Sequence, residues 1–256
     1  MSSNFSIDIK FIGGLSSTQK MAFTAARDRW REVIVGALPP VTLDGEVISG
    51  VQIEAQGVFI DGNNGILGQA GPTVVRNGSD LPAKGLMSFD TADLAQMESN
   101  GSLTDVILHE MGHVLGLGTL WSANFFDFVR GSGTNDPLYV GPKVRAEYGR
   151  LLNSSARDVP LANTGGPGTL EGHWRELAFA HELMTGFISG VQRPLSRMTI
   201  AALDDMGYEV DYNAADDYEL PDNNMLAMLA LSAPMLPCCR ITRPKPVRMS
   251  ELEPAE

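Results

Sequence analysis

The chain has 256 residues, of which 43% are hydrophobic and 20% charged, a balance typical of globular proteins. Its two cysteines, Cys238 and Cys239, are adjacent and cannot link distant parts of the fold, but a chain of this length can bury a core without disulfides. The formal net charge of −12 argues against a nucleic-acid partner, which requires clustered Lys and Arg. No apolar run is long enough to span a bilayer, so we expect no transmembrane segment.

The N-terminal part of the chain predicts a strand followed by a long helix. Residues 5–12 alternate apolar with polar side chains, as in a half-buried strand. Ser16 and Gln19 have the spacing of a capping box, and an apolar stripe at helical spacing then continues as far as Gly36. Trp30 belongs to this stripe, so we expect it in the core beneath a sheet.

Strands and helices continue along the chain, which indicates an α+β or α/β layout over residues 5–117. From 118 to about 193, Gly, Pro, Asn and Ser are frequent, and we expect mostly loop with short helices. Beyond about residue 237 the tail has no aromatic residue, and we expect it to be disordered. The other predicted elements are strands within 48–60, a turn at 61–65, a strand over 85–90, and helices over 91–101 and 194–207.

Residues 102–117, SLTDVILHEMGHVLGL, predict a helix that carries a metal-binding motif. Ser102 stands at the expected N-cap, with Asp105 three residues later. At about 100° per residue the apolar side chains fill one arc of this helix, whereas His109 and His113 lie about 40° apart on the opposite side. We therefore expect the apolar face to pack on the sheet while both imidazoles point into a cleft.

The motif has the composition of a catalytic zinc site. Two imidazoles at positions i and i+4 can reach one Zn²⁺ at about 2.0–2.1 Å each. Glu110 is well placed to act as the general base that takes a proton from a bound water. Gly116 allows a sharp turn after the helix. Histidine occurs only four times in the chain, so a chance match is expected on the order of one time in a hundred or less.

The third metal ligand is not evident from local spacing. The common long form of the motif has a histidine six residues after the second one, but here that position is Thr119. The remaining histidines are His173 and His181, and His181 has no second histidine four residues on, so we expect it to be structural. Spacing alone does not choose between His173 and an acidic ligand at Asp127 or Glu147.

Three segments resemble the leishmanolysin family of metzincin zinc endopeptidases: HEMGHVLGLGTLW, then GHWRE after a long spacer, then ELMTG. The resemblance implies that His173, which lies 60 residues after His113, is the third zinc ligand, and that Met184 forms the methionine turn beneath the zinc. DGNNGILGQAGP and LMSFDTAD resemble the loop and edge strand that precede the zinc helix, and such an edge would bind an extended peptide through main-chain hydrogen bonds.

The same resemblance implies a metzincin-like α+β fold with a twisted mixed N-terminal sheet, two long helices, an active-site cleft and a loop-rich C-terminal subdomain. RPLSRMTIAALDDMGYEV resembles the C-terminal helix of bacterial members, and the body without disulfides also favours a bacterial relative. Gly186 stands where some metzincins have a tyrosine ligand, so we expect none. We expect an N-terminal subdomain over 1–117, a C-terminal subdomain over 118–221, and a tail over 222–256 that is disordered in part.

The function expected from these features is a zinc-dependent endopeptidase that acts on protein or peptide substrates, with Glu110 as general base. The alternatives are a non-catalytic, zinc-stabilised binding or adhesion protein, and a hydrolase with an acidic third ligand. A calcium ion at Asp61, Asn63 and Asn64 is an additional expectation, because these side chains supply oxygen atoms in a turn. The resemblance implies a secreted or extracellular protein, although no signal peptide is visible and a cytoplasmic location stays open.

Overall fold

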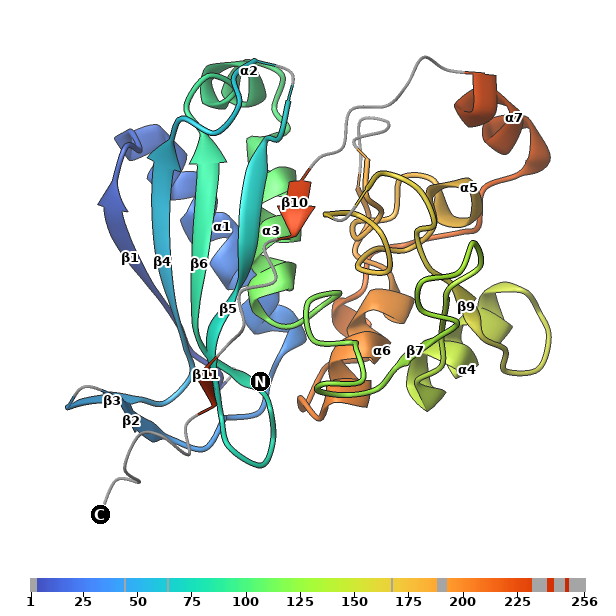
Figure 1. Cartoon of the computed structure of the whole chain (residues 1–256), viewed down its shortest axis with the longest axis horizontal. Coiled ribbons are helices and arrows are strands. Elements are labelled where there is room, and N and C mark those ends of the chain that lie inside the picture. The colour runs from blue at the N-terminus through green and yellow to red at the C-terminus, as the bar shows by residue number, and fades with distance from the viewer. Residues whose placement is uncertain are drawn as a thin grey trace.

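The computed structural model describes residues 4–43, 45–63, 65–166, 168–187, 193–231, 239–241 and 247–248. In these residues a six-stranded sheet with two long helices on one face stands beside a part made mainly of helices, loops and short strands (Figure 1). The helices are α1 (Ser17–Val33), α2 (Leu94–Ser99), α3 (Leu103–Val114), α4 (Pro142–Leu151), α5 (Glu176–Phe179), α6 (Arg197–Met206), α7 (Asn223–Leu231) and the 3-10 turn η1 (Tyr212–Ala214).

The strands of the large sheet follow the order β1-β4-β6-β5-β10, and β11 also pairs with β5. Strands β1, β4 and β6 are parallel, β5 is antiparallel to β6, and β10 and β11 run parallel to β5. The α+β class is therefore confirmed. The strands are β1 (Ile7–Gly13), β2 (Val41–Leu43), β3 (Glu46–Ile48), β4 (Val51–Val58), β5 (Gly68–Val75), β6 (Pro82–Asp90), β7 (Val129–Arg130), β8 (Leu138–Tyr139), β9 (Val159–Pro160), β10 (Cys239–Ile241) and β11 (Val247–Arg248).

The prediction that the strand over 85–90 forms the edge of the sheet is wrong. That segment belongs to β6, which lies between β4 and β5. The next strand is β5, which lies between β6 and the short strands β10 and β11. Sequence patterning missed β5 because its residues, GQAGPTVV, include two glycines and Pro72. Strand β6 could be recognised because its residues are buried and mostly apolar, whereas β5 is specified by pairing with β6 and not by its own side chains.

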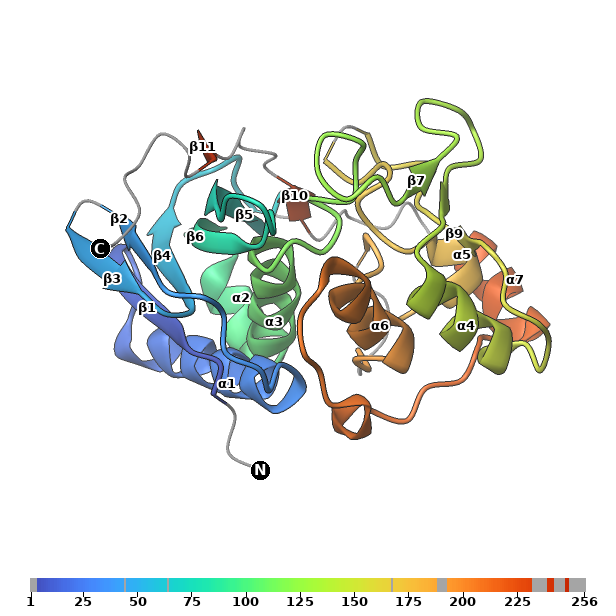
Figure 2. The same ribbon diagram turned by 90° about the horizontal axis from the view of Figure 1, so that it is seen from below.

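Helix α1 begins as predicted and ends slightly earlier. Ser16 and Gln19 form both hydrogen bonds of the capping box. The helix ends at Val33 and not near Gly36, since the next residue, Ile34, forms a β-bridge with Val210. Trp30 is fully buried, as expected, and its indole N–H donates to the carbonyl of Leu108 at 3.0 Å, which ties α1 to α3. Both helices cover the same face of the sheet (Figures 1 and 2).

Helix α3 is buried along the part that carries the motif. Residues 106–114 are all buried, including both histidines of the motif. The apolar arc packs toward the sheet and α1, and the C-terminal part of the chain covers the other side. A cleft above the motif therefore stays a prediction. Ser102 stands at the N-cap, as predicted, although its side chain makes no capping hydrogen bond.

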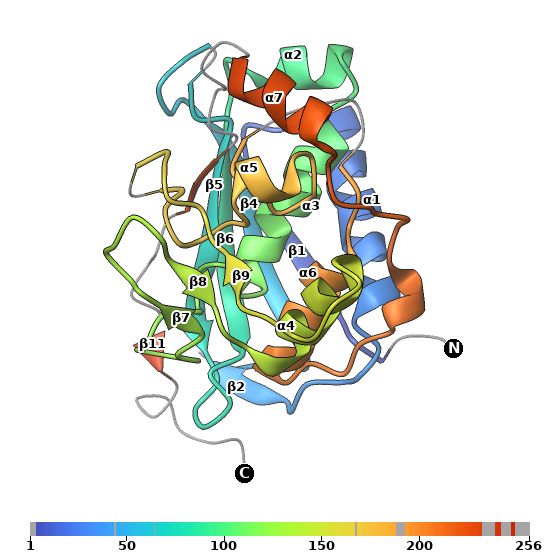
Figure 3. The ribbon, with the colours of Figure 1, turned by 90° about the vertical axis from the view of Figure 1, so that its right-hand side faces the viewer.

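The segment from 118 to 193 is more regular than its composition suggested. Strands β7, β8 and β9 form a small antiparallel sheet, and α4 is a helix of ten residues. Asp205 of α6 accepts hydrogen bonds from the amides of Lys143 and Val144, and so caps α4 from another element. Figure 3 shows α4 and this small sheet in front of the main sheet. Local patterning could not reveal a cap that lies about 60 residues away in sequence.

The turn predicted at 61–65 is organised by a buried carboxylate. Asp90 accepts hydrogen bonds from the backbone amides of Ile60, Asp61, Gly62 and Ala92. Burial alone would raise the pKa of Asp90, but these donors together hold it below its usual value. The helix predicted over 194–207 is α6, with Ser196 as its N-cap and Gly207 in the left-handed region at its end.

The tail predicted over 222–256 begins with Asp222 and contains α7, β10 and β11, and its remaining residues, Cys238 included, lie outside those described. The subdomain boundaries after residues 117 and 221 stay predictions. Among the residues described, no helix has the length and apolar character that a bilayer-spanning segment requires.

Candidate metal centre

The C-terminal end of α3 positions the first two histidines. His109 and His113 are one turn apart, and their rings meet edge to face with centroids 4.6 Å apart. After the helix, the amide of Leu117 donates to the carbonyl of Gly112 and the amide of Gly116 to that of His113, which is the pattern of a Schellman motif. Gly116 has φ 108°, so glycine is needed for the sharp turn that the sequence predicted.

Thr119, which takes the place of the usual third histidine, has a structural role. Its hydroxyl donates to the carbonyl of His113 at 2.8 Å and so satisfies the end of the helix. The chain then passes close to the segment before His173. A Cβ atom on Gly118 would stand 2.0 Å from the carbonyl oxygen of Gly172, so this approach requires a glycine. The close approach of these two glycines brings the remote histidine to the helix.

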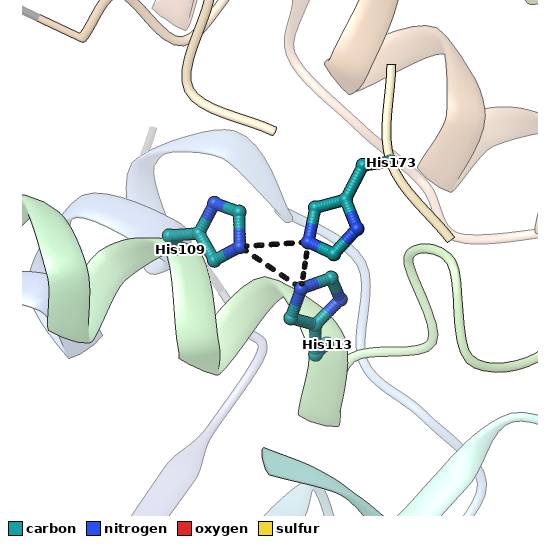
Figure 4. Close-up of side chains that lie close together, drawn as sticks. All are labelled: His109, His113 and His173. Atoms are coloured by element: carbon teal, nitrogen blue, oxygen red, sulfur yellow. Dashed lines mark hydrogen bonds between the residues drawn. The ribbon is translucent and has the colours of Figure 1, made fainter. Parts of the chain in front are cut away.

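The three histidines meet at their Nε2 atoms (Figure 4). The Nε2 atom of His113 lies 3.0 Å from that of His109 and 3.1 Å from that of His173, and the third separation is 3.2 Å. All three side chains are fully buried. Among the described residues they form the one cluster of three or more His, Cys, Asp or Glu groups suited to hold a metal ion.

Backbone carbonyls determine which nitrogen of each ring carries a proton. The Nδ1 atom of His109 lies 2.7 Å from the carbonyl oxygen of Leu183, and that of His113 lies 2.7 Å from the carbonyl oxygen of Leu117. The Nδ1 atom of His173 lies 3.0 Å from the carbonyl oxygen of Thr169. A carbonyl can only accept a hydrogen bond, so each Nδ1 must donate. The neutral rings then present three Nε2 lone pairs to one another.

Three converging lone pairs fit a metal cation. A tetrahedral ion with bonds of about 2.0–2.1 Å would hold its nitrogen ligands about 3.3 Å apart, close to the observed separations. Protonation of the rings would instead place positive charges in contact inside the protein, at a large cost. The donor set of three neutral imidazoles, each oriented by a carbonyl, is the set that zinc takes in catalytic sites.

Glu110 is buried between α3 and the start of β5. A Cβ atom at Gly68 would stand 3.1 Å from Cγ of Glu110, so this part of β5 packs directly on the glutamate side chain. Gly68 is the residue of β5 that pairs with Cys239 of β10. The glutamate that follows the first histidine therefore lies beneath β5.

Met184 lies in a turn that packs against the same helix. The turn, residues 182–185, closes with a hydrogen bond from the amide of Thr185 to the carbonyl of Glu182. Met184 is buried, and its sulfur lies beside Gly112 of α3, between the two histidines in sequence. Its role as an apolar floor beneath a metal ion stays a prediction. We call residues 182–185 the methionine turn.

The acidic candidates for the third ligand lie elsewhere. Asp127 is exposed, and Glu147 is ion-paired with Arg150 and Arg197. Neither belongs to the cluster, so the geometry favours His173 as the third ligand, and the ligand set stays a prediction. His181 is also outside it.

Calcium at the 61–65 turn stays a prediction. Asn64 lies outside the described residues, and the carboxylate of Asp61 accepts a hydrogen bond from the amide of Ile66. The residues that sequence patterning missed at the metal centre are the carbonyl partners, Leu117, Thr169 and Leu183. No side-chain pattern could have identified them, because they act through the backbone.

The fold and the site define a mixed α+β protein with a three-histidine centre built from one helix and one remote loop. A family model described as leishmanolysin matches residues 63–228, which include all of these histidines. The chain belongs to the leishmanolysin family.

Curated relatives agree with this assignment. The chain is 30% identical over 148 residues to a leishmanolysin homolog from Crithidia fasciculata, a match that covers 54% of this chain and 22% of that protein. It is 40% identical over 83 residues to leishmanolysin-like peptidases from Caenorhabditis briggsae and Caenorhabditis elegans, covering 31% of this chain and 12% of each relative. The matches thus span less than a quarter of these relatives. The bacterial origin expected from the sequence stays a prediction.

Proposed function

We propose that the protein is a zinc-dependent endopeptidase that hydrolyses protein or peptide substrates. The observation that carries this proposal is the convergence of three Nε2 atoms, each with its Nδ1 atom held by a carbonyl, on the helix that also bears Glu110. Membership in the leishmanolysin family and the similarity to proteins named leishmanolysin-like peptidases support it. Secretion or an extracellular location, which the resemblance implies, belongs to the same proposal.

His109, His113 and His173 would hold the ion. When bound, zinc would lower the pKa of a water molecule and polarise the substrate carbonyl. Glu110 would take the proton from the attacking water and deliver it to the departing nitrogen. The three carbonyl partners keep the imidazoles in one tautomer and one orientation, so the ligand atoms are preorganised. Met184 would support the rings from below.

We place the extended substrate along the outer edge of β5, because Glu110 packs under the first residue of that strand. Main-chain hydrogen bonds to such an edge bind a peptide without regard to its side chains. Over Gly68–Ala70 this edge is paired with β10, so a peptide bound there would have to replace Cys239–Ile241. The C-terminal segment therefore competes with substrate.

Removal of residues 232–256 is expected to lower KM for a peptide substrate, with kcat little changed. The deletion frees the β5 edge and leaves every metal ligand in place. Steady-state kinetics with a fluorogenic peptide would measure this. The matched control removes only 249–256, which keeps β10 and β11. Equal KM values for the two truncated chains would contradict the placement of substrate on β5.

The function is tested by measuring bound metal and peptide cleavage together. We expect stoichiometric zinc by elemental analysis, cleavage of a peptide library at internal bonds, and loss of cleavage after treatment with a zinc chelator that is reversed by added Zn²⁺. Bound zinc without cleavage of any peptide would support the alternative, a non-catalytic binding protein stabilised by zinc. Cleavage that survives complete removal of zinc would contradict both.

A further inference from the structure

Glu182 is a fully buried carboxylate at the start of the methionine turn. One carboxylate oxygen, Oε2, accepts a hydrogen bond from the amide of Met184 at 2.6 Å. The other, Oε1, accepts from the amide of Ser196 at 3.2 Å and from the hydroxyls of Ser196 and Thr199 at 2.6 and 2.5 Å. All of these partners are donors, which is the environment of an ionised carboxylate. The contacts join the methionine turn to the N-terminus of α6.

We propose that Glu182 is a positioning residue for the metal centre, which orients His109 and the segment that carries His173 through the methionine turn. This inference rests on the proposed function, because it assumes that these histidines bind the ion. Glu182 does not belong to the cluster of metal-binding groups, and therefore acts through other residues.

The connection to His109 passes through one peptide group. The amide N–H of Met184, which Glu182 binds, and the carbonyl of Leu183, to which the Nδ1 atom of His109 donates at 2.7 Å, belong to the same planar peptide unit. In a trans peptide these two groups point in opposite directions, so fixing the N–H also fixes the carbonyl. The carboxylate also polarises the peptide and strengthens its carbonyl as an acceptor. Glu182 thus determines both the orientation and the basicity of the His109 ring.

The connection to His173 passes through its neighbour, Trp174. The amide of Trp174 donates to the carbonyl of Met184 at 3.0 Å, and its indole N–H donates to the hydroxyl of Thr199 at 2.8 Å. The same hydroxyl donates to Glu182. Glu182 therefore ties the methionine turn, α6 and the third-ligand segment into one network.

A purely structural role would not require an acid at this position. Burial raises the pKa of Glu182, and the hydrogen bonds from Ser196, Thr199 and Met184 offset only part of that effect. Buried ionised groups are weak contributors to stability, and apolar packing of similar volume often serves as well. Glu182 instead acts on the peptide unit that holds the His109 ring, so orientation of a metal ligand explains why an acid stands at this position.

Glu182→Gln is the variant that tests this role. Glutamine has one acceptor oxygen, so its NH2 group must face either the amide of Met184 or the donors at Ser196, and one of the two connections is lost. We expect the zinc affinity of the full chain to fall about 10–100-fold, the loss found when outer-shell partners of metal ligands are removed. Affinity is measured by competition with a chromogenic chelator, together with the Tm of the metal-free protein.

The matched control is Asp205→Asn. Asp205 is a half-buried carboxylate of α6, the helix that contains Thr199, and it also accepts hydrogen bonds from two backbone amides and a hydroxyl, but it caps α4. We expect this variant to lower the Tm of the metal-free protein and to leave zinc affinity unchanged. If Glu182 had only a structural role, Glu182→Gln would likewise lower the Tm of the metal-free protein and leave zinc affinity unchanged.

Three outcomes decide the proposal. A lowered Tm with unchanged zinc affinity in Glu182→Gln would overturn it. If Glu182→Gln does not fold, Thr199→Val is tested in its place, because it breaks only the link from Trp174 to Glu182. A smaller loss of zinc affinity in Thr199→Val supports the proposal, and an affinity equal to that of the wild-type protein contradicts it. If the wild-type chain itself binds no zinc, the proposed function fails first, which separates that failure from an error about Glu182.

Discussion

Replacing Glu110 with glutamine is expected to abolish most peptide hydrolysis while zinc stays bound. The substitution keeps the size of the side chain, so the contact with Gly68 of β5 can persist. It removes the group that we propose takes the proton from water and passes it to the leaving nitrogen. General acid–base catalysis contributes about 10²–10⁴-fold to rates, so we expect kcat/KM to decrease by at least about 10²-fold. The ligand histidines are untouched, so zinc content should match that of the wild-type protein.

The measurements are kcat/KM on one peptide and zinc content of the same preparation. Glu171→Gln is a suitable control, since Glu171 lies near His173 in sequence but contacts Ser132 and Gly133 at the surface. We expect that variant to retain activity. Cleavage by Glu110→Gln within about tenfold of the wild-type rate would remove Glu110 from the mechanism.

The second large effect is expected from His173→Ala. Loss of one imidazole leaves two ligands, and zinc should no longer be retained stoichiometrically after dialysis. The affinity loss should exceed the roughly 10–100-fold that an outer-shell partner contributes. Activity should disappear together with the metal. Because zinc bound to the folded state stabilises it, added Zn²⁺ should also raise Tm less in this variant than in the wild-type protein.

His181→Ala provides the matched control for this experiment. His181 is the one histidine of the four in the chain that lies outside the cluster. We expect the His181→Ala variant to keep its zinc and its activity. Stoichiometric zinc in His173→Ala would contradict the three-histidine centre, and the geometry around His109 and His113 would then need another ligand.

Some of this architecture could be predicted because its causes are local. The capping box at Ser16 and Gln19, the turn at Gly116 and the end of α6 at Gly207 follow from the conformations and hydrogen bonds of neighbouring residues. The pairing of His109 with His113 follows from the helical repeat alone. Strand β5 could not be predicted, because pairing with β6 specifies it.

The sequence by itself determined that a helix presents two imidazoles and a glutamate together, since spacing along a helix is a local property. Only the tertiary structure brought His173, and not Asp127 or Glu147, to the two helix histidines, because a residue 60 positions away is placed by chain packing, here by the contact of Gly118 with Gly172. Tertiary structure also decided that residues 106–114 of α3 are buried and that β6 lies between β4 and β5. The carbonyls that orient the imidazoles could also be identified only from the tertiary structure, because their role depends on backbone geometry and not on residue type.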